Sequence, residues 1–146
     1  ARPGFGDFVS FCSRSGIPFE IASGGVDLYA GPFFRGQGVT VKAFFGRARV
    51  TAAGLKITYP FLRRMSLSAF KADRVRRMKR AGYRVVFFGD GPNDFKAARL
   101  ADKVFAAGRL LKLCRARCVA AAPLTDFSRE RFAGAVFPMH QHHART

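Results

Sequence analysis

In the first part of the chain, apolar residues recur with the period of a helix and then with that of a strand. Phe8, Phe11 and Cys12 fall on one side of a helix that should end at Gly16. Residues 17–22 form a short apolar run that predicts a strand. The Ser-Gly-Gly triplet that follows predicts the end of that strand, and a short helix is expected over 27–34.

Between residues 39 and 59 apolar and polar residues alternate, which is the pattern of strands with one covered face. Ala53 and Gly54 mark a turn inside this stretch. We therefore expect two or three antiparallel strands, forming a small β-hairpin insertion over residues 39–60.

From residue 68 onward the pattern predicts helices alternating with strands that are covered on both faces. A helix should run from Ser68 towards Gly82, and "RVVFF" at 84–88 is a continuous apolar run typical of a buried strand. The elements expected after it are a helix over 93–100, a strand over 103–106, a helix over 108–115, a strand over 118–122 and a helix from Thr125. This alternation implies an α/β fold with a parallel sheet and right-handed crossovers.

Length and composition set the broad class of protein. The 146 residues are enough for one domain, and a hydrophobic fraction of 49% is enough for a real core. No apolar stretch approaches the roughly 18 residues that a membrane span needs, and the N-terminus does not resemble a signal peptide. We therefore expect a cytoplasmic protein with no membrane partner.

The net charge of +17 allows two interpretations. It could attract polyanions, or it could reflect arginine-rich composition spread along the chain. No RNP signature, zinc-finger spacing or basic zipper is present, so we expect no specific nucleic acid as partner. Phosphate-bearing small molecules would also be favoured by a positive site.

Cysteines and histidines give no separate site. Three cysteines cannot form a complete disulfide framework, and we expect reduced, mostly buried thiols. The three histidines lie in the polar tail over residues 139–146, which we expect to be flexible rather than metal-binding. The predicted core domain is therefore residues 1–138.

Residues able to bind phosphate and a metal ion lie at or near the predicted strand ends, where parallel α/β sheets bind ligands. Asp90 and Asp94 carry oxygen ligands of the kind that Mg²⁺ prefers. Ser23, with the N–H of Gly24, could bind an anion, and the Lys71 ammonium could bind phosphate. Together they predict a magnesium-assisted phosphate site.

Each of these features also has a plain structural interpretation. Asp-Gly is a common turn, and Asp94 could simply favour a helix N-terminus. A Ser-Gly-Gly triplet is often only a loop, and Lys71 in a basic helix could be a solvated lysine. Their order along the chain and their placement at strand ends favour the functional interpretation.

The same residues resemble the motifs of the haloacid-dehalogenase (HAD) superfamily of phosphatases. "VVFFGDGPND" is similar to its fourth motif, "IASGG" to its second, and "AFKADRV" to its third. Within the superfamily the chain looks most like the phosphoserine-phosphatase branch, and there most like phosphatases acting on 2-hydroxy-3-keto-5-methylthiopentenyl-1-phosphate. The resemblance implies a three-layer Rossmann-like core and a Mg²⁺-dependent phosphomonoester hydrolase acting on a small phosphorylated metabolite.

The resemblance also implies a role for each matching residue. Ser23, helped by the Gly24 amide, would bind the phosphoryl oxygens, and Lys71 would neutralise the charge on nucleophile and phosphoryl group. Asp90 would ligate Mg²⁺ directly, and Asp94 would complete the metal shell, either directly or through a water molecule. Asn93 would orient the substrate or the loop. The implied catalytic residues are thus Lys71, Asp90 and Asp94.

The chain departs from the family in one motif. The Asp-x-Asp motif that supplies the nucleophile in these enzymes is absent from the sequence. We expect a C-terminal fragment that lacks the first strand and the cap, and that has no phosphatase activity by itself. The alternatives are a non-catalytic HAD-like domain that binds phosphate or metal and, less favoured, a basic nucleic-acid-binding protein.

Overall fold

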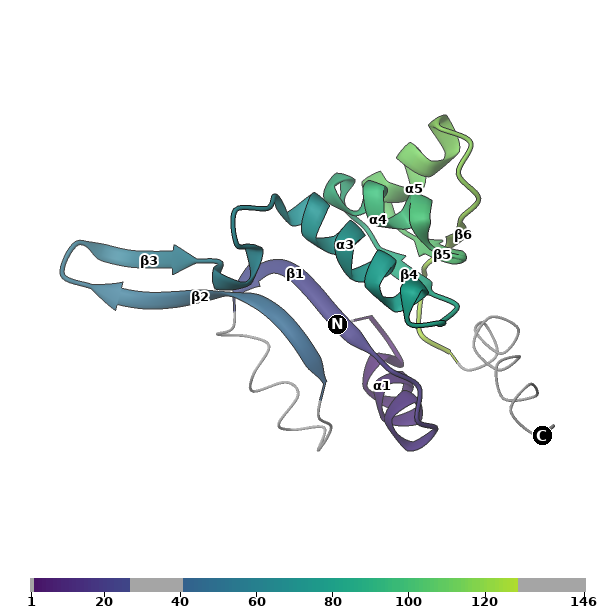
Figure 1. Cartoon of the computed structure of the whole chain (residues 1–146), viewed down its shortest axis with the longest axis horizontal. Helices are drawn as coiled ribbons and strands as arrows, with labels where there is room; N and C mark the ends of the chain where they lie inside the picture. Colours follow the sequence, from purple (N-terminus) through teal and green to yellow (C-terminus); the bar gives the residue numbers. More distant parts are fainter. Residues whose placement is uncertain (1, 27–40, 129–146) are drawn as a thin grey trace. The chain divides into compact units, whose positions relative to one another are not determined.

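A computed structural model describes residues 2–26 and 41–128 (Figure 1). The helix expected over 27–34, the first residues of the alternating stretch and the tail over 139–146 lie outside these ranges. The chain divides into two compact units, residues 5–67 and residues 1–4 with 68–146. Each unit is described by itself. The single core domain over residues 1–138 stays a prediction.

The first unit, residues 5–67, begins with the predicted helix. Its elements are α1 (Phe5–Arg14), β1 (Glu20–Val26), β2 (Lys42–Thr51), β3 (Gly54–Thr58) and the 3-10 turn η1 (Pro60–Leu62). The α1 helix ends before Gly16 and buries Phe8 and Cys12, as the spacing predicted, together with Val9. The Phe8 ring packs edge-on against Phe19 with ring centroids 5.8 Å apart. This contact holds the helix against the segment that leads into β1.

The sheet of this unit is mixed, in the order β1-β2-β3. The β1 strand pairs parallel with the first half of β2, and β3 pairs antiparallel with its second half. The predicted end of the first strand at the Ser-Gly-Gly triplet is wrong, because β1 continues to Val26. The strand bulges there instead: three residues, 23–25, lie between the pairs Ala22–Phe44 and Val26–Gly46, where β2 has one.

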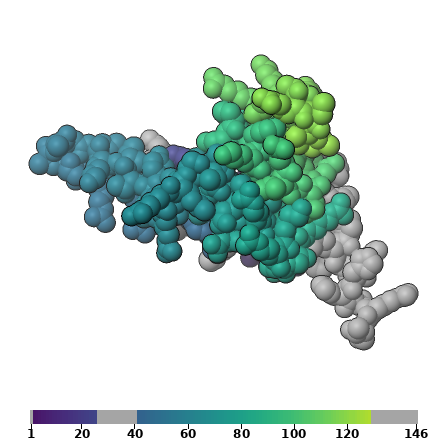
Figure 2. All heavy atoms as spheres, turned by 45° about the horizontal axis from the view of Figure 1, so that its top comes forward, coloured from purple at the N-terminus to yellow at the C-terminus, as the bar shows by residue number. Residues whose placement is uncertain are grey.

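The predicted antiparallel strands are confirmed as the β2–β3 hairpin, with its turn at residues 52–53. Its outer half carries exposed apolar side chains on one face, where Val50 pairs with Leu55. Arg49 pairs with Lys56 on the opposite face. Figure 2 shows this hairpin in blue with its side chains uncovered on the face in view.

The second unit contains the predicted alternation of helices and strands. Its elements are α3 (Leu67–Arg80, whose first residue belongs to the other unit), β4 (Val86–Gly89), η2 (Pro92–Asp94), α4 (Phe95–Leu100), β5 (Lys103–Ala106), α5 (Gly108–Ala116) and β6 (Ala122–Pro123). The three strands form a parallel sheet in the order β4-β5-β6. The predicted α/β class with a small antiparallel part is therefore confirmed.

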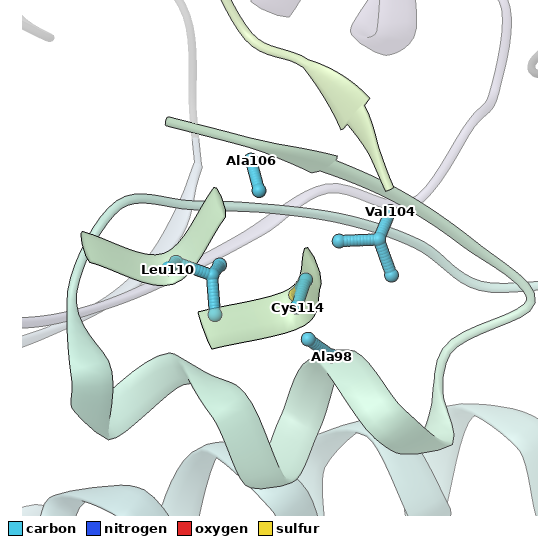
Figure 3. Close-up of a cluster of buried hydrophobic side chains, with 5 residues drawn as sticks. All are labelled: Ala98, Val104, Ala106, Leu110 and Cys114. Carbon is cyan, nitrogen blue, oxygen red and sulfur yellow. The ribbon is translucent and has the colours of Figure 1, made fainter. Parts of the chain in front are cut away.

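The core of this unit is built from small residues around one leucine. Leu110 and Cys114 of α5 lie against β5 and α4, and their side chains point towards those of Val104, Ala106 and Ala98 (Figure 3). Leu110 and Cys114 are fully buried. The alanines allow α5 to approach β5 closely, and this places the α5 N-terminus beside the loop that follows β4.

The end of the described chain differs from the prediction. The last strand is shorter than expected, because residues 118–119 close the end of α5: Cys118 adopts a left-handed φ of 55°, and Val119 N–H binds the Cys114 carbonyl at 2.9 Å. The helix expected from Thr125 is wrong for residues 125–128, which are not helical. Phe127 instead donates its N–H to the Pro3 carbonyl and buries its ring beside Phe88. Among the described residues, no helix is long and apolar enough to span a bilayer.

Candidate functional site

The loop after β4 folds around the carboxylate of Asp94. Its Oδ2 accepts the N–H of Asp90 at 3.1 Å and the N–H of Gly91 at 3.0 Å. A Cβ atom at Gly89 would lie 2.8 Å from the same oxygen, so only glycine allows the carboxylate to come this close. Asp94 is therefore the anchor that gives the Asp-Gly loop its shape.

Lys71 brings a buried positive charge to this loop. It lies in the first turns of α3, is only 8% exposed, and places Nζ 2.6 Å from Asp94 Oδ1. A second hydrogen bond, 3.3 Å long, joins Nζ to the Asn93 side-chain oxygen. The interpretation of Lys71 as a solvated lysine is therefore wrong. Its third N–H has no acceptor among the residues that the structure describes.

Asp90 differs from Asp94 in having its backbone held and its side chain exposed. Its N–H is bound by Asp94, and its carbonyl accepts the N–H of Leu110 at 3.1 Å. Its carboxylate makes no hydrogen bond or ion pair within residues 2–26 and 41–128. Next to a buried ion pair, the loop thus holds the Asp90 backbone by hydrogen bonds and exposes a carboxylate that has no partner in the described part of the chain.

This donor set fits part of a magnesium site. Within the described ranges, no group of three His, Cys, Asp or Glu side chains is placed to hold a metal ion. Mg²⁺ is commonly held by one or two carboxylates, with water and substrate phosphate completing its six ligands. The exposed Asp90 carboxylate suits this role. Asp94 has less to offer a metal ion, because Oδ2 already accepts two N–H groups and Oδ1 accepts the Lys71 ammonium, which leaves one lone pair on Oδ1. Its part in a metal shell stays a prediction.

Ser23 and Gly24 lie in the other unit, on the bulged part of β1. The Ser23 Oγ accepts the N–H of Gly25 at 3.0 Å, and the Gly24 carbonyl accepts the Tyr59 hydroxyl at 2.9 Å. The structure therefore brings Lys71, Asn93, Asp94 and the Asp90 backbone together, and it places Ser23 and Gly24 in a separate unit. That both parts form one site stays a prediction from the sequence.

Sequence reasoning missed a residue that contacts the predicted phosphate-binding segment, Ser23–Gly24. Tyr59 lies 35 positions from Gly24, and neither apolar periodicity nor a motif links the two. Gly46, over which the Tyr59 ring lies, was missed for the same reason. The alternating pattern of the hairpin placed both residues in one sheet, but it gave no register between that sheet and β1.

The fold matches that of phosphoserine phosphatase. The structure of a substrate-bound phosphoserine phosphatase complex matches it with a TM-score of 0.66 and 20% identity, over 91% of this chain and 62% of that one. The likeness to this structure confirms the predicted fold class. No family model matches the sequence.

The relatives by sequence are more specific. The chain is 33% identical over 131 residues to a 2-hydroxy-3-keto-5-methylthiopentenyl-1-phosphate phosphatase of Geobacillus thermodenitrificans, covering 86% of this chain and 59% of that protein. It is 31% identical over 130 residues to the bifunctional enzyme MtnB/MtnX of Bacillus licheniformis, covering 30% of that protein. The chain thus spans less than two thirds of either relative. These relatives support the phosphoserine-phosphatase-like branch and confirm the predicted resemblance.

Proposed function

We propose that this chain carries the phosphate- and metal-binding part of a Mg²⁺-dependent phosphomonoester hydrolase that acts on a small phosphorylated metabolite. The observation that carries the proposal is the arrangement around Lys71. A buried ammonium, one N–H of which has no acceptor among the described residues, lies beside a hydrogen-bonded loop whose exposed Asp90 carboxylate also has no partner there. Phosphoryl transfer needs positive charge of this kind around the transferred group.

Each residue takes a role that its surroundings permit. Lys71 is held by Asp94 and Asn93, so its remaining N–H has a fixed direction and can bind a phosphoryl oxygen. Asp90 is the direct ligand for Mg²⁺, which would neutralise phosphate charge when bound. Asp94, predicted as a second metal ligand, acts here by shaping the loop and orienting Lys71. Ser23 and the Gly24 amide bind the phosphoryl oxygens from the β1 bulge.

The nucleophile is the missing part of this proposal. No Asp-x-Asp occurs in the 146 residues, so we expect the chain alone to release no phosphate. This absence favours one second candidate, a HAD-like domain that binds phosphate or metal without turnover. The two candidates differ in what a supplied nucleophile would do.

A chimera tests the proposal. This chain would be joined to the part of the Geobacillus relative that it does not span, and phosphate release would be measured with 2-hydroxy-3-keto-5-methylthiopentenyl-1-phosphate and with phosphoserine. We expect Mg²⁺-dependent release that Asp90→Asn abolishes. A folded chimera that binds phosphate without turnover would support the binding domain instead, and one that does neither would contradict both candidates.

The expectations of no specific nucleic-acid partner, no membrane partner and a cytoplasmic location stay predictions. Salt-dependent retention on duplex or single-stranded nucleic acid would overturn the first of them. The hairpin face with Arg49 and Lys56 is the place to look, because both side chains are exposed.

A further inference from the structure

Tyr59 reaches across the whole three-stranded sheet of the first unit. It follows β3 directly, its ring lies over Gly46 of β2, and its hydroxyl donates to the Gly24 carbonyl of β1 at 2.9 Å. A Cβ atom at Gly46 would lie 2.6 Å from the Tyr59 ring, so the ring takes the space that this glycine leaves. This hydrogen bond joins the first and third strands of the sheet.

The β1 strand, which carries the Gly24 carbonyl, is not regularly paired with β2 at this point. Three residues of β1, Ser23–Gly25, lie between two register pairs where β2 has one residue. Backbone groups in such a bulge need other partners, because the regular ladder is disrupted there. Two side chains provide them: Tyr59 binds the Gly24 carbonyl, and Ser23 binds the Gly25 N–H at 3.0 Å.

Both of these contacts fix the same peptide group. The Gly24 carbonyl and the Gly25 N–H belong to one planar peptide, so a hydrogen bond at one end limits rotation at the other. Because this peptide joins two glycines, its backbone could adopt many conformations if no hydrogen bond restrained it. The Tyr59 hydroxyl therefore helps to keep the Gly25 N–H directed at Ser23 Oγ.

Whether Ser23 can bind phosphate depends on which hydrogen bonds its hydroxyl group already makes. A serine hydroxyl has one proton to donate and two lone pairs that accept. One lone pair of Ser23 Oγ accepts the Gly25 N–H, so the hydroxyl proton of Ser23 must point away from that N–H. Within the described ranges this proton has no acceptor. Ser23 is thus prepared to donate to an anionic oxygen.

We propose that Tyr59 is a positioning residue for phosphate: from across the sheet, it orients the Gly24–Gly25 peptide and through it the donor direction of Ser23. This inference rests on the proposed function, since it assigns Ser23 to the substrate phosphoryl group. Tyr59 itself touches no phosphate in this proposal. The Gly46 site makes room for its ring.

The test uses the full chain with Tyr59→Phe, which removes only the hydroxyl. The matched control is Tyr83→Phe, because Tyr83 is likewise exposed and no partner for its hydroxyl lies in the described ranges. NMR would follow hydrogen exchange of the Gly25 amide and the dissociation constant of inorganic phosphate. We expect Tyr59→Phe to speed the exchange and to weaken phosphate binding, each about 3–10-fold, the size of one lost hydrogen bond. Tyr83→Phe should change neither.

Coupling to Ser23 separates positioning from a general loss of stability. Tyr59→Phe should weaken phosphate binding in the wild type but add nothing in a Ser23→Ala background. Equal weakening in both backgrounds, or a Gly25 amide that does not respond to Tyr59→Phe, would overturn the inference.

A third result would separate the inference from the proposed function. If the Gly25 amide responds but inorganic phosphate binds the wild type without perturbing Ser23, the cross-sheet hydrogen bond stands. The phosphate role of Tyr59 then falls together with the proposed function. Gly46→Ala gives an independent check, because displacing the Tyr59 ring should reproduce the faster Gly25 exchange of Tyr59→Phe.

Discussion

Replacing Lys71 by methionine should destabilise the chain by about 3 kcal/mol, although methionine fills similar volume. Removing one partner of a buried ion pair commonly costs about 3–5 kcal/mol, because the other charge stays buried and uncompensated. Lys71 and Asp94 are 8% and 5% exposed and lie 2.6 Å apart. The lower end applies here, since Asp94 would keep its hydrogen bonds from two backbone N–H groups.

The companion variants are Asp94→Asn and the double variant with Lys71→Met. Asp94→Asn should cost at least as much as Lys71→Met, because its amide can serve the loop N–H groups or the ammonium but not both. The double variant buries no charge, and its amide oxygen can still accept from Asp90 and Gly91. We therefore expect the double variant to be at least about 2 kcal/mol more stable than the sum of the single effects predicts.

Urea unfolding followed by circular dichroism would measure these free energies. Lys79→Met is the matched control on the same helix: its Nζ lies 3.4 Å from Asp102, and its side chain is 43% exposed. That pair should contribute less than about 1 kcal/mol. If the effects of Lys71→Met and Asp94→Asn add within about 0.5 kcal/mol, the two residues do not act as a pair and the description of the loop is wrong.

Two further predictions concern titrating groups. A hydrogen bond from the Val85 N–H holds the pKa of Asp102 in the folded chain below its ordinary value of 3.8. The ionised Asp102 carboxylate therefore stabilises the fold above that pH, and this stabilisation is lost as the pH falls through the lower pKa of the folded chain. Unfolding free energies of wild type and Asp102→Asn should therefore converge in acid, and a constant difference would contradict this. Burial raises the pKa of Cys12 to about 11, and Cys114 is also buried, whereas Cys118 is exposed. A thiol reagent at pH 8 should label Cys118 first, and equal labelling rates for all three would refute the described packing.

The parallel part of the fold was predictable because its strands are short and apolar. The strand expected over 103–106 is β5 itself, and its last three residues are buried, which a continuous apolar run indicates. The helix that follows was also placed to within one residue. In this part of the chain, local pattern and tertiary packing favour the same structure.

The candidate site could be predicted only where its functional residues lie close together in the sequence, within one loop. The Gly-Asp-Gly-x-x-Asp spacing identified the loop around Asp90, but it did not show that Asp94 forms a buried ion pair with Lys71. That ion pair joins residues 23 positions apart, and its burial depends on how α3 packs. The prediction that β1 ends at the Ser-Gly-Gly triplet was wrong. Pairing with β2, which lies far away in the sequence, extends β1 through a bulge at the triplet, and local sequence signals do not reveal this pairing.

The most direct test of the central claim is a Mg²⁺ titration of thermal stability with wild type, Asp90→Asn and Asp7→Asn. Asp90 is the proposed metal ligand, whereas Asp7 is an exposed carboxylate in the first turn of α1. An ion that binds only the folded chain adds about 2.7 kcal/mol of stability at a hundredfold excess over its dissociation constant. We predict that Mg²⁺ raises the melting temperature of wild type and Asp7→Asn but not of Asp90→Asn. An equal response in all three proteins would contradict the claim.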